Sequence, residues 1–156
     1  MQWTLQPKGY VAFEHVHYNQ DEIFFVKKGS LKVVMNGRDY FAETGQTLTV
    51  PKGVAHTAHN NSGGIMDCEV SYVPGLDQNT FMECFCGLVN DGLLDKKGGI
   101  NIPRMGYFLT VMKAKCLARP TAIPAPVFAL SLKVFYLMGL LRGWNKLYEK
   151  YTGHMA

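Results

Sequence analysis

The first half of the chain is a series of short segments that each look like a β-strand, separated by turn residues. The segments are rich in β-branched and aromatic side chains, and they lie at residues 12–18, 22–26, 31–35, 39–43, 46–50, 56–60 and 66–73. Asn36-Gly37 separates two of them and suits a type I′ hairpin, since both central residues of that turn need positive φ. Seven or eight short strands at this spacing predict an all-β sandwich or barrel.

The second half changes its hydrophobic period and predicts helices. Asp77 or Asn79 can begin a helix in which apolar residues recur every three or four positions. We further expect a loop over 90–103, a helix over 104–118, a proline-rich stop over 119–126, and a helix over 127–153 that bends near Gly139 or Gly143. The predicted parts are a β-barrel over 1–75 and, over 76–156, a helical extension that packs on the barrel or on a partner subunit.

Charge differs between the two parts. Residues 1–75 hold six Lys/Arg and seven Asp/Glu, whereas residues 76–156 hold ten Lys/Arg and five Asp/Glu. The basic residues form no run and do not alternate with aromatic residues, so we expect no nucleic-acid partner. A helical surface rich in lysine is the simpler explanation of the positive charge.

The four cysteines predict free thiols. Cys68, Cys84, Cys86 and Cys116 form no C-x-x-C pair, and the first ten residues lack the apolar segment of a signal peptide. Mostly buried free thiols are typical of a reducing compartment, so we expect a cytoplasmic protein.

One apolar run lies in the last predicted helix. Residues 127–141 are interrupted by Lys133 and are shorter than the roughly 20 apolar residues of a spanning helix. Contact with a membrane surface stays open, because basic and aromatic residues follow the run. Packing on the barrel or on a second subunit is the simpler expectation, since this content needs burial, and a C2 homodimer would supply it. The residues concerned are Phe128, Leu130, Val134, Phe135, Leu137 and Met138.

Polar side chains that could bind a metal lie on the predicted strands. Residues two apart share a strand face, so His15 and His17 project together, and the turn that follows can bring Glu22 close to them. His56 begins a later strand, after a turn shaped by Pro51 and Gly53. Three imidazoles and a carboxylate suit Fe, Mn, Zn, Ni or Cu. Taken alone, an H-x-H strand is more often a solvated polar face than a metal site.

Two glycine-bounded motifs resemble those of the cupin superfamily. The first motif is matched at Gly9, His15, His17, Glu22 and Gly29, and the second at Gly45, Pro51, Gly53, His56 and Asn60. Fifteen residues separate the two motifs, and every fixed position of both motifs is present.

The resemblance implies a jelly-roll barrel, with a fold that extends to about Val73. It also implies that His15, His17, Glu22 and His56 bind one divalent transition metal. The family includes dioxygenases, isomerases, lyases and regulatory modules, so the fold alone does not choose among them.

Neighbouring residues have simpler expected roles. Strand alternation places His59 on the face opposite His56, and Asn60 is expected to act in a turn. Some of Phe13, Phe24, Val26, Val50 and Tyr72 must face the barrel interior, where a small-molecule ligand would bind.

The sequence is compatible with two functions. A metal-dependent enzyme would act on a small oxygenated or aromatic molecule, with dioxygen cleavage favoured slightly over isomerase, cyclase or lyase chemistry. In that enzyme Glu22 would stay a ligand or detach as a general base. The alternative is a non-catalytic cupin that binds or senses a small molecule.

Overall fold

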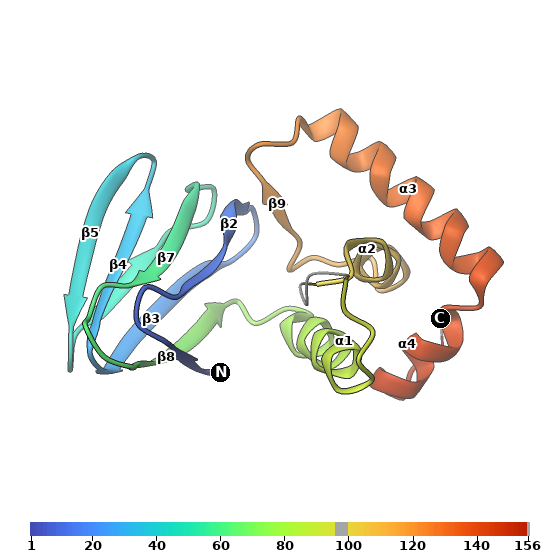
Figure 1. The fold of residues 1–156 in the computed structure, drawn as a ribbon. Helices are drawn as coiled ribbons and strands as arrows, with labels where there is room; N and C mark the ends of the chain where they lie inside the picture. Colours follow the sequence, from blue (N-terminus) through green and yellow to red (C-terminus); the bar gives the residue numbers. More distant parts are fainter. Residues whose placement is uncertain (96–99, 156) are drawn as a thin grey trace. The chain divides into compact units, whose positions relative to one another are not determined.

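The structure is a computed structural model that describes residues 1–95 and 100–155 (Figure 1). It divides the chain into two compact units. The first holds Met1–Gly75 together with Ala118–Ala122, and the second holds Leu76–Leu117 and Ile123–Ala156. The division after Gly75 coincides with the predicted boundary, but the return of a later segment to the first unit was not predicted. Part of the loop expected over 90–103 lies outside the described residues.

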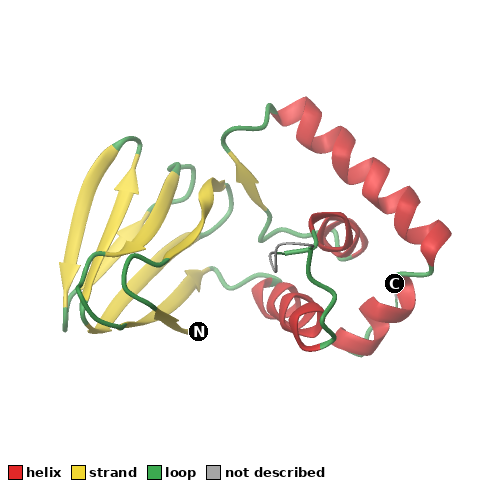
Figure 2. Ribbon diagram, in the orientation of Figure 1, coloured by secondary structure: helices red, strands yellow, loops and turns green. Residues whose placement is uncertain are grey.

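The first unit is made of two antiparallel sheets (strands in yellow in Figure 2). One sheet has the order β1-β8-β3-β6 and the other β5-β4-β7-β2-β9. Apart from the β4 and β5 pair, hydrogen-bonded neighbours are not consecutive in sequence in either sheet, as expected for the predicted jelly roll. The strands are β1 Gln2–Leu5, β2 Tyr10–His17, β3 Asp21–Lys28, β4 Ser30–Met35, β5 Arg38–Glu43, β6 Thr47–Val50, β7 His56–Asn60, β8 Met66–Val73 and β9 Ala118–Pro120.

Alternation along the strands builds the apolar core of this unit. Residues two apart face the same side, so Phe24 and Val26 of β3 are buried together with Leu31 and Val33 of β4. The full cluster is Phe24, Val26, Leu31, Val33, Ala42, Val50, Ala58, Met66, Cys68 and Val70. Phe13 is not part of this interior, because its side chain is 59% exposed.

Turns set the strand register as their residue types predict. Asn36 and Gly37 both have positive φ, at 48° and 76°, which confirms the expected conformation of the β4–β5 hairpin. Asn60 confirms its expected turn role at the end of β7. Its Nδ2 donates to the carbonyls of Leu5, Gln6 and Gly64, and its Oδ1 accepts from the backbone and hydroxyl of Ser62.

Strand β9 was not predicted, because the helix was expected to continue to residue 118. The helix actually ends at Val111, and Lys113 takes a positive φ of 49°, which an α-helix cannot accommodate. Residues 118–120 then pair with β2, so that Arg119 lies opposite Val16. Pro120 is tolerated because β9 is an edge strand.

The second unit is helical (helices in red in Figure 2). Its elements are α1 Gln78–Asn90, α2 Ile102–Val111, α3 Ala125–Arg142 and α4 Asn145–Thr152. The last predicted helix is two helices, because Gly143 takes the left-handed conformation that ends α3. Asp77 precedes α1 without capping it, since its carboxylate accepts from the backbone N–H groups of Lys115 and Cys116.

Aromatic side chains pack the interior of the helical unit against glycines. A Cβ on Gly139 of α3 would lie 2.0 Å from the Tyr107 ring, and one on Gly106 of α2 would lie 2.5 Å from the Phe135 ring. These glycines therefore allow α2 and α3 to approach closely. Trp144 and Tyr148 are buried in the same cluster.

Helix α3 is longer than the apolar run found in the sequence. At 18 residues, it is the one helix in the described part of the chain that is long and apolar enough to cross a membrane, by length and composition alone. Of its residues only Gly139 is buried, and Leu130, Val134 and Leu137 are exposed. Among the described residues, the expected burial of Leu130, Val134 and Leu137 is therefore not found.

The role of Asn60 predicts a local loss of stability. Asn60→Ala leaves three backbone carbonyls without their donor, and we expect unfolding free energy to fall by about 2–3 kcal/mol. Asn61→Ala is the matched control, because that neighbouring side chain is exposed, and its effect should stay within about 0.5 kcal/mol. Urea unfolding followed by circular dichroism measures both changes, and equal effects would contradict the structural role of Asn60.

Candidate metal centre

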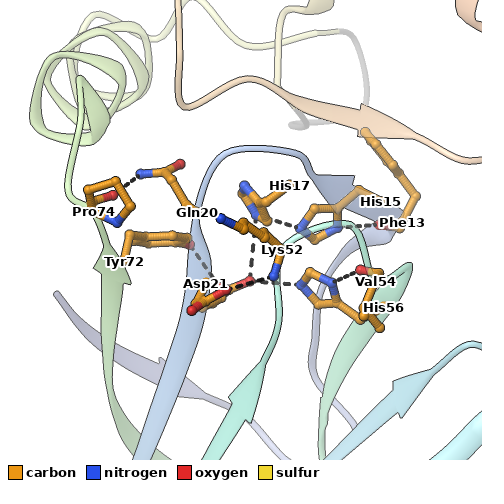
Figure 3. Close-up of polar contacts among 11 residues, drawn as sticks. Phe13, His15, His17, Gln20, Asp21, Lys52, Val54, His56, Tyr72 and Pro74 are labelled. Carbon is orange, nitrogen blue, oxygen red and sulfur yellow. Dashed lines mark hydrogen bonds and ion pairs between the residues drawn. The ribbon is translucent and has the colours of Figure 1, made fainter.

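Four potential ligand side chains meet inside the first unit (Figure 3). One ligand atom from each of His15, His17, Glu22 and His56 lies within 4.8 Å of the others. His17, Glu22 and His56 are buried, and His15 is partly exposed. The structure thus brings together all the residues that the sequence predicted as ligands, and the side on which His15 lies is the more accessible one.

The strand register explains this convergence. His15 of β2 lies directly opposite His56 of β7, and His17 follows two residues later on the same face. Glu22 comes from β3 in the other sheet, where it pairs with Tyr72 of β8. The ligand atoms therefore meet between the two sheets, which a single strand could not achieve.

The turn before β7 is tied to the ligand strands. Gly53 has a φ of +81°, which favours glycine, and its N–H donates to the His17 carbonyl at 2.7 Å. The Lys52 N–H donates to the Asp21 carboxylate at 2.8 Å. These two bonds give a physical reason for a glycine at the position that the second motif predicted.

Backbone carbonyls orient two of the imidazoles. Nδ1 of His15 donates to the Phe13 carbonyl at 3.0 Å, and Nδ1 of His56 donates to the Val54 carbonyl at 3.1 Å. A carbonyl oxygen can only accept, so Nδ1 carries the proton in both rings. The Nε2 atom of each ring therefore faces the centre and, when it carries no proton, offers the lone pair that a metal requires.

Nitrogen and oxygen atoms that can each donate an electron pair lie close together at the centre of the cluster. His56 Nε2 lies 2.7 Å from Glu22 Oε2, and His15 Nε2 lies 3.2 Å from His17 Nε2. A neutral His56 and an ionised Glu22 would oppose two acceptors, so a proton or a cation is needed between them. Three nitrogen donors and one carboxylate oxygen also form a set that transition metals favour. The residues present therefore fit a divalent transition metal.

Electrostatics favour the ligand form of the carboxylate. Burial alone would raise the pKa of Glu22, but the hydrogen bond and charge of His56, with smaller effects from His17 and Tyr72, hold that pKa below its usual value. The Tyr72 hydroxyl donates to Glu22 Oε1 at 2.8 Å. Glu22 is consequently anionic at neutral pH, with Oε2 directed at the histidines.

Electrostatics also favour neutral His15. Burial lowers the pKa of His15, and the nearby His56 lowers it further. Its ring is therefore uncharged at neutral pH, which leaves Nε2 free to bind a metal.

Two polar contacts near the cluster were not predicted from the sequence. Tyr72 was expected only to line the interior, although its position on the same strand face as a buried residue was a signal. Gln20 was not singled out, yet it is buried and its Nε2 donates to the Pro74 and Gly75 carbonyls, at 3.0 and 3.1 Å. No sequence pattern indicated that bond, because it joins residues more than fifty positions apart.

His59 and the cysteines lie outside the cluster. His59 packs against the ring of Tyr10, with centroids 6.0 Å apart, as expected from strand alternation. The four cysteines are free, and Cys86 is the exposed one. Burial raises the pKa of Cys68 to about 11 and that of Cys84 to about 12, so both stay protonated thiols.

Comparison with known proteins places the first unit in a family. Residues 1–72 match the family model of the cupin domain. The HTH-type transcriptional regulator PuuR of Escherichia coli (strain K12) is 31% identical over 71 residues, which cover 46% of this chain and 38% of the regulator. The chain thus spans less than half the length of the curated relatives it matches.

Solved structures also match part of this chain. TT1209 from Thermus thermophilus has 21% identity and a TM-score of 0.42, with 46% of this chain and 67% of that chain covered. A predicted oxalate decarboxylase from Thermotoga maritima has 21% identity and a TM-score of 0.43, with coverage of 46% and 61%.

Two histidines on one strand provide a matched test of the ligand assignment. His56→Ala removes a ligand, and we expect bound metal per chain to fall at least about tenfold, since even supporting groups cost 10- to 100-fold in affinity. His59→Ala should keep its metal, because that ring faces the other way. Elemental analysis of protein purified without chelator measures both, and full occupancy of His56→Ala would refute the assignment.

Tyr72 provides a test of the supporting bond. Tyr72→Phe removes only the hydroxyl that donates to Glu22, so Glu22 loses a bond that lowers its pKa and orients it. We expect affinity for Zn²⁺ to fall by about 10- to 100-fold. Competition with a chelating dye measures this change, and Tyr40→Phe, in which the altered ring is exposed, should bind as the unaltered protein does.

Proposed function

Residues 1–72 belong to the cupin superfamily, and we propose that this domain is a metal-dependent enzyme acting on a small oxygenated or aromatic molecule. Oxidative cleavage by dioxygen is the favoured reaction, ahead of isomerase, cyclase or lyase chemistry. The observation that carries the proposal is the convergence of His15, His17, Glu22 and His56 within 4.8 Å.

The ligand set leaves room for chemistry. If the bound ion took six ligands, these four side chains would leave two positions open for a substrate or water. A bound divalent metal would supply Lewis-acid chemistry and, if it is redox-active, chemistry with dioxygen. His15 is the least buried of the four ligands, so we infer that substrate approaches from its side.

The protein's own residues have separate tasks in this proposal. His15 and His56 are held by backbone carbonyls, which keeps their Nε2 atoms in place during turnover. Glu22 acts as a ligand or, when it detaches, as a general base for a proton of the substrate. Tyr72 limits the motion of that carboxylate by donating to Oε1.

A second candidate is a non-catalytic domain that senses a small molecule. It is favoured by the 31% identity with a transcriptional regulator over the matched 71 residues. In this alternative the same metal centre would bind a ligand without turnover. A reducing cytoplasm remains our proposed location in either case, supported by the four free cysteines.

One experiment separates the two candidates. Protein purified without chelator is analysed for metal, loaded with that metal, and assayed for oxygen uptake and for turnover of a panel of catechols, diketones and hydroxy acids. Under the enzyme proposal, Glu22→Gln should lower the rate at least about 100-fold, as loss of a general base or ligand does, and His59→Ala should leave it unchanged. Binding of panel compounds without any turnover would reject the enzyme and favour the sensor.

A further inference from the structure

Helix α3 carries an apolar stripe on its solvent face. Val127, Leu130, Val134, Leu137 and Leu141 are all exposed, with Leu130 62% and Leu141 89% accessible. We call these five residues the α3 seam. Single exposed apolar residues are ordinary, but a continuous stripe of this kind marks an interaction surface.

The spacing within the α3 seam is that of a coiled-coil interface. The five residues follow one another at intervals of three, four, three and four positions, which is the heptad pattern of positions a and d. Valine occupies the first two a positions and leucine both d positions. β-Branched residues at a with leucine at d favour pairing of two helices.

The face of α3 opposite the α3 seam packs against α2. Gly139 lies against the Tyr107 ring of α2, and Phe135 lies against Gly106. Helix α3 thus has one face in the core of its unit and the α3 seam on the other. The α3 seam needs a partner outside that core.

A lipid partner is disfavoured by three observations. Lys133 lies exposed at the middle of α3, where a charge destabilises a spanning helix most. An interfacial helix needs a strongly polar face, whereas the solvent face of α3 is mostly apolar. Trp144 and Tyr148, the aromatic residues that could have anchored the helix at a lipid surface, are instead buried.

The exposed area suits a modest protein interface. A fully exposed aliphatic side chain presents about 100 Å² of apolar surface, so the α3 seam with the neighbouring Leu140 exposes roughly 350 Å² in each copy. Two copies would bury roughly 700 Å² from these residues, and flanking side chains would bring the total toward about 1,000 Å². Lys133 can lay its stem along the edge and keep its ammonium in water.

We propose that the α3 seam binds the α3 seam of a second copy of this chain, which makes the protein a symmetric dimer through its helical extension. The pairing does not depend on the metal centre or on its function. An interface at the low end of the specific range predicts a dimer that dissociates on dilution.

Cross-linking tests the contact directly. Val134 is the central residue of the α3 seam and occupies an a position, so it faces its own copy in a parallel pair of helices. Val134→Cys should form a disulfide-linked dimer under mild oxidation, in a chain where exposed Cys86 is changed to Ser. Ala129→Cys in the same background is the control, because Ala129 is exposed on α3 outside the seam. Equal cross-linking of both variants would overturn the proposal.

Sedimentation velocity over a range of concentrations tests the same contact in solution. Leu130→Glu with Leu137→Glu should raise the dimer dissociation constant at least about 100-fold, as loss of two central interface residues does, while Ala129→Glu should not change it. Circular dichroism checks that each variant is folded. A monomer at every concentration would overturn the proposal, and so would seam-dependent flotation of a monomer with anionic vesicles.

Discussion

The contact between His56 and Glu22 is the constraint on which the first unit depends. Both side chains are buried, and an isolated charge in such an interior is very costly. The barrel compensates by giving each group a fixed partner on its far side, the Val54 carbonyl for His56 and the Tyr72 hydroxyl for Glu22. These bonds hold both polar side chains inside the unit. The same strands therefore supply residues to the ligand cluster and to the apolar core.

The turns at both ends of β7 hold the ligand strands in register. Ligands that come from different sheets meet only if the connecting segments return the chain at a defined register. Gly53 allows the chain to turn tightly enough for its N–H to reach the His17 carbonyl. Asn60 closes the other end of β7 by binding three carbonyls from two separate loops. The strand that carries His56 is therefore fixed at both ends by bonds that do not use the ligand atoms of the cluster.

The β-strands of the first unit could be predicted best, because side chains on a strand alternate between its two faces with a period of two residues. Alternation was enough to separate His56 from His59 and to place His15 with His17, and the turn residues located the hairpin at Asn36. Tyr72 and Gln20 escaped prediction because their partners are distant in sequence and depend on sheet pairing. Strand β9 escaped because three residues without alternation carry no strand signal, and only the edge of β2 makes them a strand.

In the helical unit, the sequence predicted helices but not which side of each helix is buried. An apolar helix in a sequence is ordinarily interpreted as core, and the helix end at Gly143 was near the expected bend. Burial could not be predicted, because α3 is apolar on nearly every side and its composition does not distinguish the packed face from the free one. The contacts with Gly106 and Tyr107 identify the packed face. The residues left over then fall at heptad spacing, a pattern that has a physical meaning only once the other face is known to be occupied.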